Sequence, residues 1–285
     1  MTKTITLPGG ETRPALGLGT WRLGESTRSR KAELAALRRA VELGWRVFDT
    51  AEMYGEGGAE TVLGEALRGA LAAGELRRED LFVVSKVYPH NASRRGAIAA
   101  CERSLRRLGL DAIDLYLLHW RGAHPLAATV EAFEALRDAG RIRHWGVSNF
   151  DLDDMRELYR VPGGERCAAN QVWYSAGQRG AEFELLPWLA RHGVPAMAYS
   201  PIDQAALATH GALAAVGRRI GASAAQVALA WLLRRPGVMA IPKAVREAHQ
   251  RENLAALAID LDAAALRAID AAFAPPQGPT PLAMN

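Results

Sequence analysis

The sequence predicts an α/β fold, a (β/α)8 TIM barrel with an N-terminal β-hairpin and an extra C-terminal helix. Short runs of β-branched and aromatic residues alternate along the chain with longer Ala-, Leu- and Arg-rich segments of helical period. Alternating strands and helices form a parallel sheet, and eight such units fit the 285 residues as a closed barrel. No Pro-, Gly- or Ser-rich linker separates two halves. We therefore expect one barrel domain over residues 1–285.

The expected elements follow one another in a regular order. The segment TITLPGGETRP predicts a hairpin that turns at Gly9 and Gly10 and could cover the bottom of the barrel. The eight expected strands are Ala15–Leu18, Arg46–Asp49, Leu81–Lys86, Ile113–His119, Ile142–Val147, Cys167–Gln171, Pro195–Tyr199 and Val238–Ile241. The eight expected helices are Ser29–Leu43, Ala59–Leu71, Ser93–Leu108, Pro125–Ala139, Asp151–Tyr159, Glu182–Arg191, Ser223–Arg234 and Val245–Leu257. Asp262–Phe273 predicts an additional helix, and a short Pro-rich tail follows it.

Residues that favour helix ends mark several of these boundaries. Gly109 and Gly140 follow helical segments, where the left-handed conformation of a C-terminal cap favours glycine. Ser223 directly precedes a helical segment, and its hydroxyl is expected to cap the N-terminus of that helix.

The composition is that of an ordinary globular protein, with 49% hydrophobic and 23% charged residues. It excludes a disordered chain, a collagen-like repeat and a coiled coil, and no apolar run approaches the ~18 residues that span a bilayer. Cys101 and Cys167 are the only cysteines and the N-terminus lacks the apolar segment of a signal peptide, so we expect a cytoplasmic protein. The net charge is +4, but the arginines are scattered, so we expect neither nucleic acid nor membrane as a partner.

Three neighbouring strands of the expected barrel end in an ionisable residue. Active sites of such barrels lie at the C-terminal ends of the strands, where Asp49 and His119 follow apolar runs and Lys86 follows Val83-Val84-Ser85. Neighbouring strands are ~4.8 Å apart, so these side chains should lie within reach of one another. Tyr54 follows Asp49 by five residues in a short loop, close enough to fold back over the group.

Each of these residues alone is more often a helix cap, a barrel-rim residue or a packed loop side chain, but together they predict an acid catalyst. A lysine ammonium beside a phenol favours tyrosinate and should lower the pKa of Tyr54 from ~10, while Asp49 holds Lys86 in place. Such a tyrosine can protonate a carbonyl oxygen that becomes an alkoxide, and His119 could orient that carbonyl. The carbonyl carbon then needs a nucleophile, and no Cys or Ser stands in a nucleophile motif. Hydride from a nicotinamide fits this requirement.

Seven segments, in order and spacing, resemble the aldo-keto reductases. They are GWRVFDTAEMYGEGGAE, VSKVYPHN, LYLLHW, GVSNF, NQVWYS, AYSPI and IPKAVREAHQREN, and together with GLGTW at Gly17–Trp21 they cover essentially the whole chain. The variants look most like the bacterial methylglyoxal-reducing branch. The resemblance implies an NADPH-dependent enzyme that reduces methylglyoxal-like 2-oxoaldehydes and other small aldehydes or ketones to alcohols. It also implies a catalytic tetrad of Asp49, Tyr54, Lys86 and His119, with Tyr54 as the proton donor.

The resemblance further implies that NADPH lies extended across the top of the barrel, and the chain has neither a G-x-G-x-x-G nor a Walker A motif. Ser148, Asn149 and Gln171 match positions that hold the nicotinamide carboxamide, and Tyr199 matches the ring that stacks on the nicotinamide. Lys243 matches the contact to the 2′-phosphate. The full set of implied cofactor-binding residues is Thr20, Trp21, Asp49, Ser148, Asn149, Gln171, Tyr199, Ser200, Pro201, Ile202, Lys243, Arg246, His249, Glu252 and Asn253.

Two departures from the family pattern bear on the 2′-phosphate. Ala244 stands where a serine often follows the lysine, and His249 stands where many members place an arginine. Arg246 lies one helical turn before His249 and could supply the charge that His249 lacks. We expect a preference for NADPH over NADH.

The tail after Phe273 is short, so we expect an open pocket. Its walls should be mostly aromatic and include the ring of Tyr54. Trp21, Tyr88 and Trp120 are the expected substrate contacts, and no metal is expected. The family habit implies a monomer that binds a small carbonyl compound.

Three other functions remain open at this point. A cofactor-binding regulatory protein of the same fold could keep the tetrad and turn over slowly. A metal-dependent barrel hydrolase would need clustered His and carboxylate ligands at strand ends, where only His119 fits. A pyridoxal phosphate barrel with Lys86 as Schiff base would leave Asp49 and Tyr54 without a role.

Overall fold

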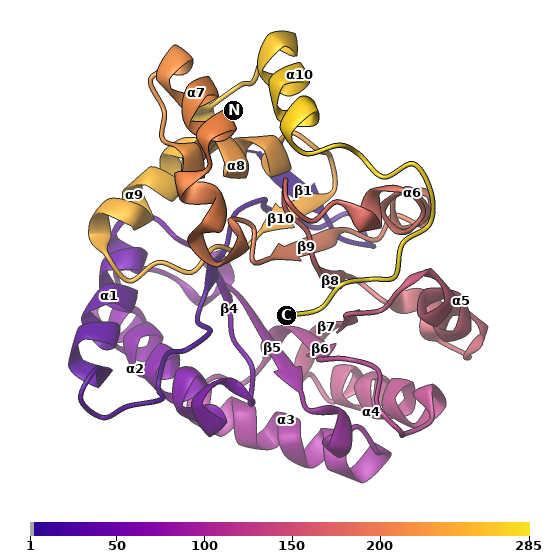
Figure 1. Cartoon of the computed structure of the whole chain (residues 1–285). Coiled ribbons are helices and arrows are strands. Elements are labelled where there is room, and N and C mark those ends of the chain that lie inside the picture. The colour runs from indigo at the N-terminus through magenta and orange to yellow at the C-terminus, as the bar shows by residue number, and fades with distance from the viewer. Residues whose placement is uncertain (1–2) are drawn as a thin grey trace.

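Eight parallel strands form a closed barrel in the computed structural model, which describes residues 3–285 (Figure 1). The strands are β3 (Leu18–Gly19), β4 (Val47–Asp49), β5 (Phe82–Val87), β6 (Ile113–Leu118), β7 (Ile142–Ser148), β8 (Asn170–Trp173), β9 (Ala196–Tyr199) and β10 (Val238–Ala240). Each pairs with the next in chain order. The segment before β3 closes the barrel onto β10, because Ala240 N donates to Ala15 O and Gly17 N donates to Ala240 O, both at 2.9 Å. The predicted barrel is confirmed.

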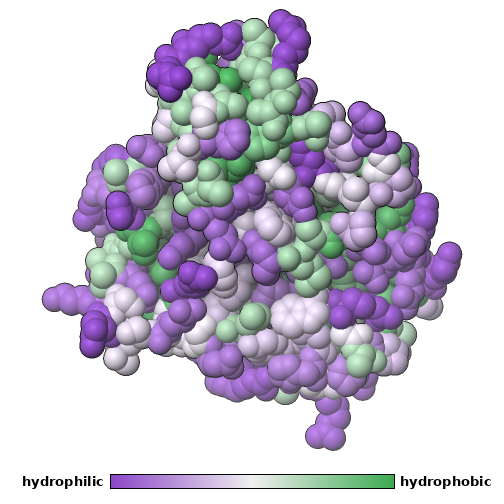
Figure 2. Space-filling model, in the orientation of Figure 1, coloured by the Kyte–Doolittle hydropathy of each residue, from purple (hydrophilic) through white to green (hydrophobic). Residues whose placement is uncertain are grey.

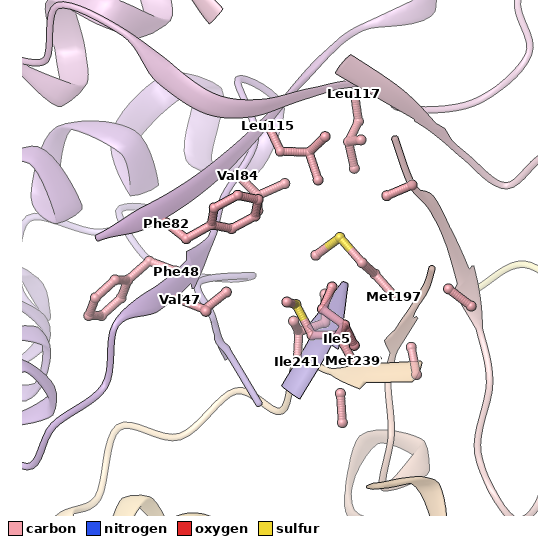
Figure 3. Close-up of a cluster of buried hydrophobic side chains, with 14 of the residues drawn as sticks. Ile5, Val47, Phe48, Phe82, Val84, Leu115, Leu117, Met197, Met239 and Ile241 are labelled. Atoms are coloured by element: carbon pink, nitrogen blue, oxygen red, sulfur yellow. The ribbon is translucent and has the colours of Figure 1, made fainter. Parts of the chain in front are cut away.

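The N-terminal hairpin consists of β1 (Thr4–Thr6) and β2 (Thr12–Pro14), which pair antiparallel. Ala15 N donates to Lys3 O at 2.9 Å, so the hairpin joins the barrel where the first barrel segment begins. Ile5 is buried in the apolar cluster of the barrel, with Met239 in the same cluster (Figure 3). The hairpin therefore covers the N-terminal end of the barrel, which leaves the opposite end open to polar residues.

Helices surround the strands (Figure 1), and within residues 3–285 none is long and apolar enough to cross a membrane. They are α1 (Arg30–Glu42), α2 (Gly58–Ala72), α3 (Arg94–Leu108), α4 (Leu126–Asp138), α5 (Leu152–Arg160), α6 (Leu185–Arg191), α7 (Gly211–Ile220), α8 (Ala224–Leu233), α9 (Glu247–Ala255) and α10 (Ala263–Ala272). Ser223 Oγ accepts from Gln226 N at 3.2 Å, and Gly109 has a φ of 66° after α3. Gly140 has a φ of 70° after α4, so all three predicted caps are confirmed.

Helix α7 was not predicted, so the expected strict alternation is wrong after β9. Its sequence, GALAAVGRRI, contains glycines that lower helix propensity. Leu213 and Val216 are buried, and α7 packs against α8. Packing of this buried face therefore stabilises a helix that the local helix propensity does not predict. Figure 2 shows apolar residues gathered over α7 and α10 at the top of the view.

Four element starts differ from the prediction by two or three residues, and one of them is β3, which begins at Leu18 rather than at Ala15. β8 begins at Asn170, because Gly164–Arg166 forms a 3-10 turn immediately before Cys167. α6 begins at Leu185, because the preceding Gly180–Glu182 forms a 3-10 turn. α9 begins at Glu247 rather than at residue 245.

Side chains at alternate strand positions fill the interior of the barrel. Phe82 and Val84 of β5 belong to this buried cluster together with Leu115 and Leu117 of β6 (Figure 3). Because successive strand residues point to opposite faces, Lys86 points to the same face as Val84, two residues nearer the C-terminal end of β5. The apolar core thus ends where the predicted polar group begins.

Candidate active site

Asp49 and Lys86 form a buried ion pair at the C-terminal ends of β4 and β5. Lys86 Nζ lies 2.7 Å from Asp49 Oδ2 and donates to Thr50 O at 2.8 Å. The side chain of Lys86 has no exposed surface and that of Asp49 is 3% exposed. A buried charge is costly unless it is paired and hydrogen-bonded, and both conditions are met here.

Tyr54 reaches this pair from the loop that follows β4. Its hydroxyl lies 3.3 Å from Lys86 Nζ, and its ring centroid lies 4.9 Å from the same nitrogen. Gly55 has a φ of 58°, and a Cβ atom there would lie 2.8 Å from the backbone of Gly24. A larger residue would therefore displace the loop, so the glycine helps to fix the approach of Tyr54.

Burial decides the protonation of Tyr54. The pKa of Tyr54 is raised well above 10 because the hydroxyl is buried, and the negative charge of Asp49 adds to this effect. The prediction that this pKa is lowered is wrong, because burial of the hydroxyl and the nearby charge of Asp49 outweigh the effect of Lys86. Burial also lowers the pKa of Lys86, an effect that Asp49 opposes. Tyr54 therefore holds its proton at neutral pH, as a proton donor must.

His119 follows β6 and stands beside Tyr54. The two rings meet edge to face with their centroids 5.7 Å apart. Burial, with a contribution from the charge of Lys86, holds the pKa of His119 well below 6.5. Its Nδ1 atom is buried without a hydrogen-bond partner among the described residues. The imidazole is therefore neutral and retains unused hydrogen-bonding capacity.

A network of amides and hydroxyls extends from the ion pair toward β7, β8 and β9. Gln171 Nε2 donates to Asp49 Oδ1 at 2.7 Å, and Ser148 Oγ donates to Gln171 O at 2.9 Å. Asn149 has a φ of 59°, donates from Nδ2 to the His119 carbonyl at 3.1 Å and accepts from the Tyr199 hydroxyl at 2.8 Å. The residues expected to grip a carboxamide and stack on its ring are thus gathered beside the tetrad.

A cavity of about 560 Å³ opens above this group. The expected residues that line it are Trp21, Asp49, Tyr54, His119, Trp120, Ser148, Asn149, Gln171, Tyr199, Ser200, Pro201, Ile202 and Lys243. Thr20 is buried behind the wall and donates from Oγ1 to Asp49 O at 2.9 Å. Tyr88 is not part of the lining: its ring lies edge-on to Trp120 at 6.1 Å and its hydroxyl donates to Glu56 at 3.1 Å. The structure therefore does not bring Tyr88 to the wall where a substrate contact was expected.

The positions expected at the adenosine end lie on a separate part of the fold. Arg246 is the exposed residue directly before α9, and His249, Glu252 and Asn253 lie on α9, outside the cavity lining. Lys243 is also exposed, and it does line the cavity. Two cations before the free N–H groups of a helix suit a phosphate. Together with the amide network and the Tyr199 ring, this arrangement fits an NADP molecule that extends from the tetrad toward α9.

The C-terminal tail lies beside the cavity, although the short tail was expected to leave the pocket open. It runs from α10 back across the barrel to a point near the centre of the view (Figure 1). Met284 and Asn285 line the cavity, and Asn285 Nδ2 donates to Ser200 Oγ at 2.9 Å. Arg179 anchors the beginning of the tail by donating to the Phe273 carbonyl at 2.6 Å. A short tail therefore still covers part of the cavity, because its start is fixed beside the barrel.

Several lining residues were missed in the sequence. Arg22 and Met53 are neighbours of predicted residues and could have been found by that adjacency. Gln204 and Ala205 line the cavity with φ values of 51° and 85°, although neither is a glycine that would signal such a turn. Among residues 3–285, no three His, Cys, Asp or Glu side chains gather in a way that could hold a metal ion.

Comparison with known proteins places this geometry in a family. A model described as the aldo/keto reductase family matches residues 15–274. Methylglyoxal reductase YeaE of Escherichia coli is 51% identical over 99% of this chain and 99% of its own length. Glyoxal reductase of Bacillus subtilis is 34% identical over 94% of this chain and 92% of its own. The crystal structure of an aldo-keto reductase from Klebsiella pneumoniae in complex with NADPH is 46% identical, with a TM-score of 0.94 and complete coverage of both chains.

Proposed function

This chain belongs to the aldo/keto reductase family, and we propose that it reduces methylglyoxal-like 2-oxoaldehydes and other small aldehydes or ketones to alcohols with NADPH. The observation that carries the proposal is the Tyr54 hydroxyl, which keeps its proton 3.3 Å from the Lys86 ammonium at the floor of a cavity. Two relatives named as methylglyoxal reductase and glyoxal reductase support this substrate class.

NADPH, when bound, would supply the hydride for the carbonyl carbon. Tyr54 gives its hydroxyl proton to the carbonyl oxygen, so that the developing alkoxide becomes an alcohol and Tyr54 becomes tyrosinate. The Lys86 ammonium stabilises this tyrosinate by its charge from 3.3 Å. Asp49 keeps the ammonium in place and charged, and a proton from water then restores Tyr54.

His119 orients the carbonyl in this proposal. Its pKa lies well below 6.5, so it meets the substrate as a neutral imidazole that donates a hydrogen bond without carrying a charge. The edge-to-face contact with Tyr54, at 5.7 Å, places both rings at the same floor of the cavity. One carbonyl oxygen can then accept from both side chains.

The cofactor would be held by residues beside the tetrad and by residues near the start of α9. Asn149, Ser148 and Gln171 would hold the carboxamide beside the tetrad, with Tyr199 as the stacking ring. Lys243 and Arg246 would bind the 2′-phosphate, which distinguishes NADPH from NADH. Their cationic charge and the N-terminus of α9 favour an anion at this position.

The side chains that line the cavity favour a small and neutral substrate. Trp21 and Trp120 contribute aromatic surface, and Met53 and Met284 contribute thioether side chains that adapt to different shapes. We further propose that the enzyme acts as a monomer formed by one barrel domain.

The test is turnover by Tyr54→Phe with methylglyoxal as substrate and NADPH absorbance as the signal. Loss of a general acid costs ~100-fold or more in kcat, so we expect at least that loss with unchanged NADPH affinity by fluorescence titration. A Phe variant with kcat close to that of the parent would refute the mechanism. Absence of methylglyoxal turnover by the parent, with turnover of other aldehydes, would refute the substrate class alone.

A further inference from the structure

Glu52 is a buried carboxylate next to the tetrad that the proposed reaction does not use. It lies in the loop between Asp49 and Tyr54 and is 6% exposed. Burial of a carboxylate requires strong hydrogen-bond partners, so its contacts identify what it holds.

Its side chain connects this loop to the segment that follows β5. Oε1 accepts from the backbone N–H of Tyr88 at 2.7 Å and from Asn91 Nδ2 at 3.1 Å. Oε2 lies 3.4 Å from Arg103 Nη2 on α3. The three donors come from the strand end, the following turn and the helix behind it, so one carboxylate joins three parts of the same βα unit.

The backbone of Glu52 makes a second connection to the same strand. Thr50 N donates to the Val84 carbonyl at 2.9 Å and Glu52 N donates to the Lys86 carbonyl at 3.3 Å. These bonds continue the parallel pairing beyond the end of β4, up to the residue that carries the catalytic ammonium. The loop that bears Tyr54 is therefore joined to the Lys86 strand by both the backbone and the side chain of Glu52.

We propose that Glu52 is a positioning residue that holds the Tyr54 loop in register with the strand end carrying Lys86. The proposal rests on the proposed function, because the distance that it sets is the 3.3 Å between the Tyr54 hydroxyl and Lys86 Nζ. Without the carboxylate, the Tyr88 N–H and the Asn91 amide lose their acceptor, and the segment from Lys86 to Asn91 can move relative to the loop. Displacement of a catalytic group by ~1 Å can cost ~100-fold in rate, so a small shift is sufficient.

The chain offers a conservative variant and a matched control. In Glu52→Gln the amide oxygen can still accept from both Tyr88 and Asn91, whereas Glu52→Ala removes the acceptor. Glu56 lies in the same loop and is exposed, and its carboxylate accepts from the Tyr88 hydroxyl at 3.1 Å. Glu56→Ala therefore removes an acidic residue and an exposed contact to the Tyr88 side chain from the same loop, but leaves the Glu52 contacts to the Tyr88 N–H and the Asn91 amide in place.

The experiment measures kcat and KM for methylglyoxal, the NADPH Kd by fluorescence, and the unfolding midpoint of each variant. For Glu52→Ala we expect kcat to fall by at least ~10-fold at an NADPH Kd within about twofold of the parent value, because the residues proposed to hold the carboxamide and the 2′-phosphate lie on other elements. Glu52→Gln should recover most of kcat, and Glu56→Ala should stay within about twofold of the parent. If Glu52→Ala does not fold, Asn91→Ala removes one donor from the same carboxylate and should lower kcat in the same sense.

A purely structural Glu52 would lower the unfolding midpoint while kcat per folded molecule stays at the parent value, and that result would overturn the proposal. So would equal losses in Glu52→Ala and Glu56→Ala. Failure of the proposed function gives a different result, because Tyr54→Phe would then leave kcat unchanged.

Discussion

Replacing Lys86 by Met tests the ion pair and the acid catalyst in one variant. Lys86 is fully buried and lies 2.7 Å from Asp49, 2.8 Å from the Thr50 carbonyl and 3.3 Å from the Tyr54 hydroxyl. In the variant, Asp49 keeps the hydrogen bond from Gln171 at 2.7 Å but loses its countercharge. Removal of one partner from a buried pair costs ~3–5 kcal/mol, so the free energy of unfolding should fall by about that amount. Turnover should fall by at least ~100-fold, because tyrosinate loses its stabilising cation.

The double variant Lys86→Met with Asp49→Asn separates the two effects. It removes both charges, and a neutral pair of similar volume at a buried site is often as stable as the ion pair. We therefore expect it to recover most of the unfolding free energy that the single variant loses. It should remain inactive, because the Lys86 ammonium that stabilises tyrosinate is still absent.

Urea unfolding followed by tryptophan fluorescence gives the stability of each variant, and NADPH oxidation gives turnover. A single variant as stable and active as the parent would show that Lys86 is not the buried countercharge described above. A double variant no more stable than the single one would show that lost packing, rather than the unpaired Asp49, causes the loss.

Two further predictions concern pH and cofactor choice. The pKa of His119 is held well below 6.5 in the folded protein, so the unfolded chain binds this proton first as the pH falls. The folded state therefore loses stability below pH ~6.5, by up to ~1.4 kcal/mol per pH unit, and this loss is absent above that pH. Urea unfolding from pH ~7.5 to ~5 should therefore show a shallower loss in His119→Phe than in the parent, and parallel curves would contradict this. Arg246→Ala should weaken NADPH binding by ~10- to 150-fold, the equivalent of one hydrogen bond to a charged group, with little change for NADH. Fluorescence titrations that give equal losses of affinity for both cofactors would show that Arg246 stabilises the local structure rather than binds the 2′-phosphate.

The sequence was most informative where the candidate catalytic residues lie at strand ends. Asp49, Lys86 and His119 could be placed together because parallel strands of a barrel finish at one rim and their spacing is fixed. Tyr54 could be added because its loop is too short to carry it far from Asp49. These inferences depend on the regular geometry of the barrel, which follows from the order and lengths of the predicted strands and loops.

Features set by packing could not be predicted in the same way. Helix α7 depends on the burial of Leu213 and Val216 against α8 rather than on local propensity. The path of the tail depends on the hydrogen bond from Arg179 to the Phe273 carbonyl, which joins residues 94 positions apart. The pKa of Tyr54 depends on burial, which outweighs a lysine whose charge is already compensated. Each of these results from long-range contacts that a pattern along the chain does not contain.

The electrostatics of the site separate its two tasks in space. At the floor of the cavity the charges of Lys86 and Asp49 cancel, Tyr54 is protonated and His119 is neutral, so these four side chains present no net charge to an incoming carbonyl. The exposed cations Lys243 and Arg246 lie apart from them, toward the start of α9, where we propose that they bind the 2′-phosphate of the cofactor. In the proposed reaction, a negative charge that develops on the carbonyl oxygen therefore meets the Tyr54 proton and the His119 ring, rather than a fixed cation that would already bind anions in the ground state. Preference for the transition state over the ground state follows from this arrangement, since the stabilising proton is transferred only when the oxygen becomes basic.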